Sequence, residues 1–391
     1  MLNSPFAPWP SFSQEEADAV SRVLLSNKVN YWTGTECREF EEEFAAWVGC
    51  SKAVSLANGT VALDLALKVL DLQPGDEVIV TPRSFVASAS SVVNAGLVPV
   101  FADIDRDSQN LSAATIQPVL TERTRAIVCV HLAGWPCDME PILSLARERG
   151  IFVIEDCAQA HGATYRGRSV GTWGHINAWS FCQDKIMTTG GEGGMVTTDD
   201  HKLWEKAWSY KDHGKSWDAI YQREHPPGFR WLHETFGTNW RMIEMQAAIG
   251  RIQLGWMPRW HEQRTRNAEA INAAARSCPA LRAPEVPNDV QHAWYRCYVF
   301  VRPELLRPDW SRDRVVQEIN AAGVPCLHGS CSEIYLEKAF ESAGLQPAQY
   351  LPVARELGET SLALLVHPTL SAKEIDKTCN VLIDVMRRAT S

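Results

Sequence analysis

The chain has 391 residues, of which 45% are hydrophobic and 22% are charged. These proportions are typical of a globular protein with a core large enough for about two domains. The net charge of −9 argues against nonspecific binding to nucleic acid, which needs a basic surface.

The first half of the chain alternates short apolar runs with amphipathic stretches. Strand-like runs lie at residues 53–55, 77–80, 98–102, 126–130, 152–155, 178–181 and 195–198. Helical patterns cover residues 15–25, 36–48, 60–70, 84–95, 112–119 and 139–148. This alternation predicts an α/β fold, a three-layer α/β/α domain around a mainly parallel sheet of seven strands.

The second half of the chain predicts a smaller α+β domain. A long amphipathic helix is expected at residues 239–257, a proline-rich loop at 279–287, a strand at 294–301 and a capped helix at 371–388. We therefore expect a large domain at 1–255, which includes the N-terminal helical segment, and a C-terminal domain at 256–391.

The cysteines and the apolar runs bear on the compartment. The 11 cysteines are scattered without a C-x-x-C pair, so neither a metal site nor a disulfide framework is indicated. The N-terminus does not resemble a secretory signal, and no apolar run approaches the ~20 residues of a membrane helix. These features predict reduced thiols and a cytoplasmic location without membrane association.

Lys185 follows an apolar run and precedes the glycine-dense turn at 190–194. A lysine shielded from water loses its proton more easily, and only the neutral amine attacks a carbonyl group. The position suits a Schiff base with an aldehyde cofactor. A surface lysine beside an ordinary glycine turn is the alternative interpretation.

Two carboxylates, Glu155 and Asp156, end the apolar run that begins at Ile151. Parallel strands present such residues at their carboxyl ends, where open α/β sheets bind ligands. Asp156 could keep a pyridine nitrogen protonated while Lys185 holds the aldehyde carbon. Helix capping or simple exposure would also explain the two carboxylates.

Residues 57–60, Ala-Asn-Gly-Thr, open the helical pattern at 60–70. A small, glycine-containing turn at a helix N-terminus exposes backbone N–H groups, and the helix dipole favours an anion there. The turn suits a phosphate group, although an ordinary N-cap has the same composition.

Taken together, these motifs resemble the DegT/StrS-type sugar aminotransferases, which are pyridoxal phosphate enzymes of fold type I. The similarity spans nearly the whole chain. The matching segments are residues 57–60, 75–82, 85–87, 155–163, 180–181 with Lys185, 191–195, 237–242, 246–250 and 253–254. The resemblance also implies an antiparallel strand in the sheet near Lys185.

The resemblance assigns roles around the cofactor ring. Lys185 would form the Schiff base with pyridoxal 5'-phosphate and later carry the proton between substrate and cofactor. Asp156 would pair with the pyridine nitrogen. Gln159 would approach the ring hydroxyl, and Phe85 would stack on the ring face.

The resemblance also assigns the phosphate contacts. Gly59, Thr60 and Ser180 would bind the phosphate from the same chain. Asn239 would reach the phosphate of the neighbouring subunit's cofactor. A homodimer with shared active sites is therefore expected.

Other positions are open to two interpretations. Arg241 could bind the carboxylate of the amino donor. His161 could act in acid–base chemistry or simply pack behind the strand. Relatives often carry a polar residue two or three places before the lysine, where this chain has the sequence Cys-Gln-Asp at 182–184.

Two segments are candidates for sugar recognition. The loop at 211–238 mixes aromatic and basic residues, including Trp217 and Arg230, and could bind a sugar or pack on a dimer partner. The segment 324–330 resembles one that lies near the acceptor, so His328 is a second candidate.

The resemblance implies a transaminase that moves an amino group from L-glutamate to a keto sugar for cell-surface polysaccharide or lipopolysaccharide biosynthesis. The acceptor would be a nucleotide-linked keto-deoxy sugar or an oxidised 3-deoxy-octulosonate (the 8-amino-3,8-dideoxy-octulosonate pathway). A sugar dehydratase and a noncatalytic regulator of the same fold are the alternatives. The dehydrating branch carries histidine in place of the lysine, so Lys185 favours transamination.

Overall fold

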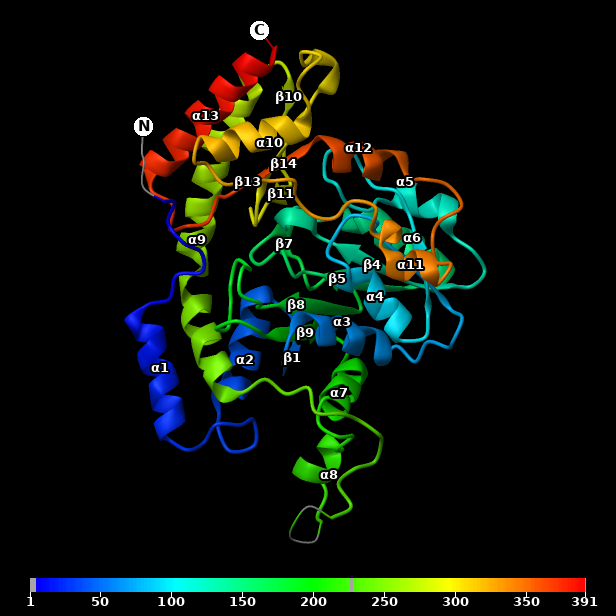
Figure 1. Ribbon diagram of the computed structural model, residues 1–391. Helices are drawn as coiled ribbons and strands as arrows, with labels where there is room; N and C mark the ends of the chain where they lie inside the picture. Colours follow the sequence, from blue (N-terminus) through cyan, green and yellow to red (C-terminus); the bar gives the residue numbers. More distant parts are fainter. Residues whose placement is uncertain (1–4, 226–227, 229, 391) are drawn as a thin grey trace.

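The computed structural model describes residues 5–225, 228 and 230–390. Its centre is a seven-stranded sheet with the order β1-β9-β8-β5-β4-β2-β3 (Figure 1). β9 runs antiparallel to β1 and β8, and every other neighbouring pair is parallel. The strands are β1 (Lys52–Leu56), β2 (Glu77–Val80), β3 (Val98–Phe101), β4 (Thr124–Val130), β5 (Phe152–Asp156), β8 (Ile176–Ser180) and β9 (Gly194–Thr198). The predicted large sheet is confirmed, and so is its antiparallel strand next to Lys185.

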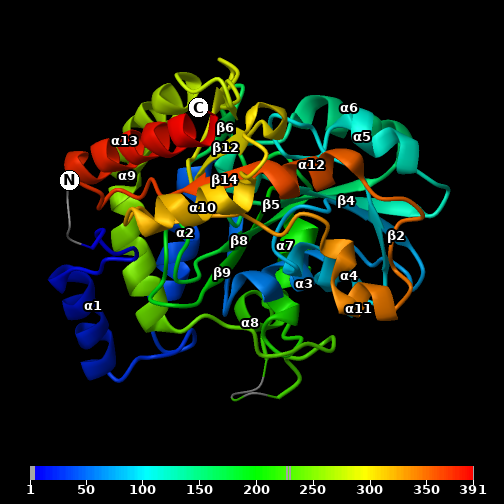
Figure 2. The ribbon, with the colours of Figure 1, turned by 45° about the horizontal axis from the view of Figure 1, so that its top comes forward.

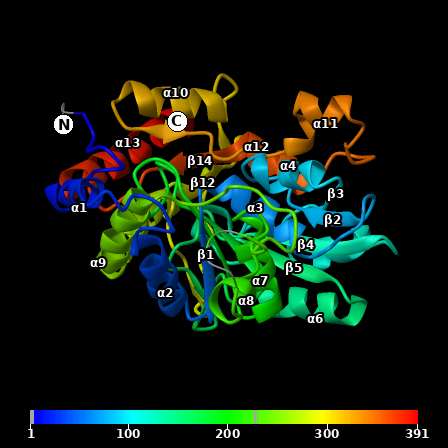
Figure 3. The same ribbon diagram turned by 90° about the horizontal axis from the view of Figure 1, so that it is seen from below.

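Helices cover both faces of this sheet because alternate side chains of each strand point to opposite sides. Val128 and Ile154 face one core, and their neighbours Ile127 and Val153 face another. Figure 3 shows α4 and α6 on opposite sides of the strands. The first face carries α3 (Gly59–Lys68), α4 (Ala87–Asn94) and α7 (His201–Tyr210); the second carries α2 (Glu36–Val48), α5 (Ala113–Ile116) and α6 (Met139–Arg149).

A single long helix, α9 (Glu244–Arg276), runs along the side of the molecule (Figure 1). It packs against α1 (Gln14–Leu25), α2 and α13 (Ala372–Thr390). It begins later than predicted because residues 239–243 are held in an extended path, with Arg241 bridged to Leu56 and Ile243 bridged to Asn30. It also ends later, since buried neighbours cover it well beyond residue 257.

The C-terminal part forms the predicted smaller α+β unit. Its four-stranded sheet has the order β10-β12-β14-β13 and packs against α10 (Arg312–Ala321) and α13. The strands are β10 (Leu281–Arg282), β12 (Cys297–Val301), β13 (Cys326–Leu327) and β14 (Ser361–Leu364). A third sheet joins β11 (Val290–Gln291), β6 (Thr164–Tyr165) and β7 (Arg168–Ser169).

Chain segments cross between the two units. The expected boundary at 255/256 falls inside the continuous helix α9. Phe6 packs against the core of the smaller unit, whereas Tyr335 and Phe340 pack on Phe101 of β3. Figure 2 shows α11 beside α4 at the edge of the large sheet. The domain division therefore stays a prediction.

The remaining helices are short. They are α8 (Trp217–Tyr221), α11 (Lys338–Ser342) and α12 (Pro352–Thr360), with 3-10 turns at Gln117–Val119, Leu132–Gly134, Pro303–Leu305 and Ile334–Leu336. α8 projects away from the sheet (Figure 1). Among residues 5–225, 228 and 230–390, none of the helices is long and apolar enough to cross a membrane.

Candidate active site

The carboxyl ends of two adjacent strands bring the predicted site residues together. β5 ends at Asp156 and β8 ends at Ser180, and Asp156 lies opposite Ala178 in a parallel register. The backbone N–H of Cys157 donates to the Ala178 carbonyl at 2.8 Å. Lys185 follows on the connection to β9, so the carboxylate, the hydroxyl and the lysine share one edge of the sheet.

Asp156 is a buried carboxylate with neutral partners. Its Oδ2 accepts from the Ser88 hydroxyl at 2.7 Å, and its Oδ1 accepts from the Ala158 backbone N–H at 3.1 Å. Only 4% of the residue is exposed, and no cationic side chain among the described residues pairs with it. A buried carboxylate is stable as an anion when a cation compensates it, and a protonated pyridine nitrogen has that charge.

The start of α3 forms a cradle against the end of β8. A Cβ atom on Gly59 would lie 2.5 Å from the Ser180 Cβ, so only glycine permits this approach. Asn58 caps the helix by accepting from the Val61 N–H at 3.0 Å. In the described part of the chain, the N–H groups of Gly59 and Thr60 have no acceptor. They and the Ser180 hydroxyl suit a phosphate.

Gln159 and Phe85 have side-chain groups free for a ring. The Gln159 Oε1 accepts from the Ala133 N–H at 2.8 Å, which leaves its amide N–H₂ to donate. Phe85 is 64% exposed although it lies one turn before Ser88, the partner of Asp156. An exposed aromatic ring one turn from the serine that contacts a buried carboxylate suits stacking on a planar cofactor. The residues at this edge therefore fit pyridoxal phosphate.

Lys185 has neighbours from distant parts of the chain that the sequence motifs did not predict. The Trp9 indole N–H donates to the Lys185 carbonyl at 2.9 Å, and the Lys185 Nζ lies 5.2 Å from the centre of the Tyr295 ring. The Tyr295 hydroxyl donates to Asp184, and the Arg296 Nη2 lies 3.5 Å from the same carboxylate oxygen. No local motif marks these partners, because they meet only through the fold.

The ionisation of Asp184 is set by this network. Burial opposes its negative charge, but the Tyr295 hydrogen bond and the charges of Lys185 and Arg296 outweigh burial and lower the pKa of Asp184. Burial raises the pKa of Tyr295, so its hydroxyl stays protonated and donates. The residue before Lys185 is thus a fixed anion.

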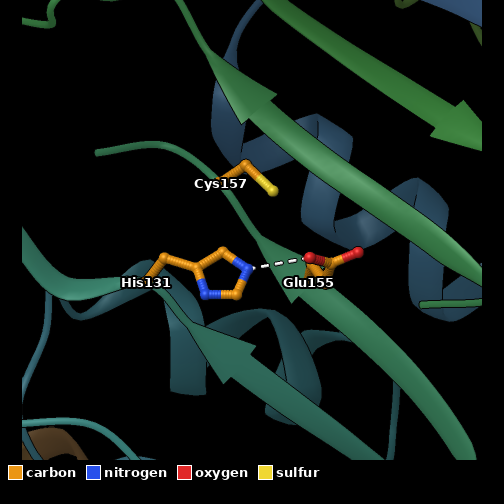
Figure 4. Close-up of side chains that lie close together, drawn as sticks. All are labelled: His131, Glu155 and Cys157. Carbon is orange, nitrogen blue, oxygen red and sulfur yellow. Dashed lines mark hydrogen bonds and ion pairs between the residues drawn. The ribbon is translucent and has the colours of Figure 1, made fainter. Parts of the chain in front are cut away.

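Glu155 organises the loop that follows β7. Its two carboxylate oxygens accept from the backbone N–H groups of Gly171, Trp173 and Gly174 at 2.7–2.9 Å. The His131 Nε2 lies 2.9 Å from the same carboxylate, with the Cys157 thiol nearby (Figure 4). These hydrogen bonds give Glu155 a structural role beside Asp156, whereas both carboxylates had suggested ligand binding.

His161 lies in an apolar environment. Its ring is 5.3 Å from that of Trp179 and 5.6 Å from that of Phe181. Burial, followed by the charges of Lys185 and Arg264, lowers the pKa of His161 to about 3. The imidazole is therefore neutral near pH 7, which favours the packing interpretation.

The residue expected to reach the neighbouring subunit and the residue suggested for the donor carboxylate lie in different environments. Asn239 is exposed and bridges to Asp212. Arg241 is committed to the same aspartate, since its Nη1 donates to the Asp212 Oδ1 at 2.7 Å. Asp212 is fully buried and also accepts from the Trp32 indole at 2.8 Å. The role of Arg241 toward a donor stays a prediction.

The three candidates for sugar recognition, Trp217, Arg230 and His328, have environments that differ from one another. Trp217 packs against Trp204 and Trp208, each with ring centres 4.9 Å away. Arg230 is exposed, and the adjacent residues 226, 227 and 229 lie outside the described residues. His328 is exposed, with its Nε2 3.4 Å from Asp313. Their substrate roles stay predictions.

Comparison with known proteins gives consistent results along the whole chain. The model of the DegT/DnrJ/EryC1/StrS aminotransferase family matches residues 10–383. The spore coat polysaccharide biosynthesis protein SpsC of Bacillus subtilis is 34% identical over 98% of both chains. The GDP-perosamine synthase of Escherichia coli O157:H7 is 33% identical over 95% of both. The solved structure of an aminotransferase from Psychrobacter cryohalolentis is 59% identical, with a TM-score of 0.98 over 99% of this chain and all of that one.

Proposed function

This chain belongs to the DegT/DnrJ/EryC1/StrS aminotransferase family, and from that premise we propose that it transfers an amino group from L-glutamate to a nucleotide-linked keto sugar. The chain is a transaminase of fold type I that depends on pyridoxal phosphate. The donor and the acceptor are the parts of the assignment that need experiments.

The observation that carries the proposal is the buried Asp156 carboxylate. It has two neutral hydrogen-bond donors and no cationic partner in the described residues, next to the strand that leads to Lys185. Pyridoxal phosphate, when bound, supplies an aldehyde and an electron-withdrawing ring whose protonated nitrogen would complete this pair. A surface carboxylate would not need such a partner.

The side chains at this edge divide the work of the transfer. Asp156 would hold the ring nitrogen protonated, and the Gln159 amide would donate to the ring hydroxyl. Lys185 would hold the aldehyde carbon, release it to the incoming amine, and then take the proton from the donor's α-carbon. Since the same lysine serves both substrates in turn, the two half reactions should follow ping-pong kinetics.

The acceptor class follows from the relatives. GDP-perosamine synthase is named for a nucleotide-linked amino sugar, and SpsC for polysaccharide biosynthesis. The first name supports a nucleotide-linked keto sugar as the acceptor, and the second supports a product destined for a cell-surface polysaccharide. An oxidised 3-deoxy-octulosonate, which carries no nucleotide, is the competing acceptor that an assay must include.

A homodimer would complete the site. Asn239 is exposed in the single chain, and so are Trp231 at 82% and Phe236 at 99%. Large exposed apolar side chains are typical of a surface that is covered in the functional assembly. We propose that this segment reaches the partner's cofactor phosphate through Asn239.

The test follows the cofactor absorbance of the purified protein. L-Glutamate should bleach the visible band of the parent protein, and a nucleotide-linked keto sugar should restore it. Lys185→Ala should lack the band of the covalently bound cofactor and all turnover, whereas Lys202→Ala, an exposed lysine on α7, should keep both. Restoration by the octulosonate alone would replace the proposed acceptor, and turnover without Lys185 would refute the mechanism.

A further inference from the structure

Arg296 lies next to Lys185 although the two are far apart in the sequence. The Arg296 guanidinium carbon is 4.7 Å from the centre of the Tyr295 ring, and the Lys185 Nζ is 5.2 Å from the same point. The amine and the guanidinium group therefore flank one aromatic ring. The two cations also share the Asp184 carboxylate, whose pKa both of them lower.

Backbone hydrogen bonds place this pair on a defined side of the site. The Tyr295 N–H donates to the Ala133 carbonyl at 2.8 Å, and the Ala133 N–H donates to the Gln159 side chain at 2.8 Å. Tyr295 and Arg296 therefore stand beside the residue expected at the ring hydroxyl. An amino acid that displaces Lys185 would bring its carboxylate to this neighbourhood, because its carboxyl carbon is attached to the carbon that bears the exchanging amine.

Arg296 retains unused hydrogen-bonding capacity. A guanidinium group has five N–H donors in a planar fork that matches a carboxylate. Among the described residues, the groups in contact with Arg296 are the Asp184 oxygen at 3.5 Å and the Tyr295 ring. At 3.5 Å the Asp184 contact is an ion pair without a hydrogen bond, so the N–H groups of Arg296 stay available to a ligand. The side chain is 15% exposed, so a ligand can still approach it.

A second guanidinium group indicates an excess of positive charge here. Arg264 is fully buried, and its Nη1 donates to the Trp294 carbonyl at 3.1 Å, while its Nε and Nη2 have no partner in the described part of the chain. Burial, followed by the charge of Arg296, lowers the pKa of Arg264 to about 9. Arg296 and Lys185 thus share one carboxylate, Asp184, and the charge of Arg264 acts on Arg296 from the buried side. A further anion would balance them.

We propose that Arg296 binds the α-carboxylate of the amino donor. Arg241, the residue that the family resemblance suggested for this role, already has a buried carboxylate partner at 2.7 Å in Asp212. Arg296 donates no hydrogen bond to a carboxylate among the described residues, and its guanidinium group lies against the same Tyr295 ring as the Lys185 amine. This assignment rests on the proposed function, because it requires an amino-acid donor at Lys185.

The test measures binding without turnover on the cofactor-loaded protein. 2-Methyl-L-glutamate lacks an α-proton, so it can displace Lys185 but cannot be transaminated, and the cofactor absorbance reports its dissociation constant. Arg296→Gln should raise that constant about 10- to 100-fold, as expected for the loss of a charged hydrogen-bond pair. 2-Aminoisobutyrate, which has only the α-carboxylate, should lose affinity by the same factor.

Matched variants separate binding from folding. Arg296→Lys keeps the charge but loses the planar fork and should raise both constants roughly three- to tenfold. Arg266→Gln, an exposed arginine on α9 that pairs with Glu262, should match the parent. If Arg296→Gln fails to fold, as judged by its thermal midpoint, the lysine variant provides the same comparison.

The outcomes distinguish the two proposals. Constants of the parent and the Arg296 variants within twofold of each other would overturn the assignment. A loss confined to 2-methyl-L-glutamate would also overturn it, because Arg296 would then hold the side-chain carboxylate. If the parent itself bound neither amine, the proposed donor class would fail instead.

Discussion

Replacing Gly59 with alanine tests the phosphate cradle at one atom. The added Cβ would lie 2.5 Å from the Ser180 Cβ and 3.1 Å from the Ser180 Cα, well inside van der Waals contact. Gly59 begins α3 and Ser180 ends β8, so neither backbone can move without shifting its helix or strand. The methyl group must therefore push the N-terminus of α3 away from the strand.

The expected effect has two parts. Overpacking of this kind costs about 1–3 kcal/mol of unfolding free energy. Moving the free N–H groups of Gly59 and Thr60 away from the phosphate should also cost about 1.5–3 kcal/mol of binding, the value of one charged hydrogen bond. The dissociation constant of pyridoxal phosphate should then rise about 10- to 150-fold.

Two control variants identify the cause. Gly255 lies within α9 with nothing near its would-be Cβ, so Gly255→Ala should leave cofactor binding unchanged and stabilise the chain by about 0.5–1 kcal/mol. Gly59→Ala combined with Ser180→Gly removes the two closest contacts, to Cβ and Oγ, and should recover part of the unfolding free energy but not the full affinity. Cofactor titration and thermal unfolding measure both quantities. A Gly59→Ala protein with the parent's affinity and midpoint would refute the cradle.

Two further predictions concern buried ionisable groups near the site. The pKa of His161 is about 3 in the folded chain and near 6.5 in the unfolded chain, so the unfolded chain binds the proton first as the pH falls. The contribution of the neutral imidazole to the free energy of unfolding is therefore complete above pH 6.5 and decreases below it. Between pH 6.5 and pH 5 the parent should lose about 1.5 kcal/mol more unfolding free energy than His161→Gln, as measured by denaturant titration. Parallel pH curves for the two proteins would contradict this prediction. Glu155→Gln should lower the thermal midpoint, because an amide oxygen cannot accept all the hydrogen bonds that the carboxylate accepts from the Gly171, Trp173 and Gly174 N–H groups and from the His131 ring. Glu262→Gln, on the exposed side of α9, is the control. Equal midpoints of the two variants would disprove the structural role of Glu155.

Local sequence patterns predicted the large sheet because its strands are continuous apolar runs bounded by turns. The pattern at Phe152–Asp156, for example, is buried on both faces and needs no distant partner to be recognised. The start of α9 could not be predicted in the same way. Residues 239–243 have a helical pattern, but bridges from Leu56 and Asn30 hold them extended.

The same distinction applies to the site. Asp156, Ser180 and Gly59 lie at strand and helix ends, where motifs and element boundaries coincide, so the sequence indicated them. Ser88 comes from the first turn of α4 and Tyr295 from the segment before β12, and neither belongs to a motif that the sequence marked. Glu155 shows the opposite problem, since it has the composition of a ligand but holds a loop.

The loop that carries Lys185 is held from both ends of the chain. Trp9 donates to the Lys185 carbonyl, and the Trp9 ring stacks on His367 and meets Trp260 of α9 edge-on. Tyr295, at the entry to β12, fixes Asp184 on the other side. In the proposed mechanism Lys185 alternates between the cofactor and proton transfer, which needs a mobile side chain on a fixed backbone. Contacts from the N-terminal segment, the long helix and the smaller unit together fix that backbone, which explains why the loop that carries Lys185 can be short and glycine-rich without losing its position.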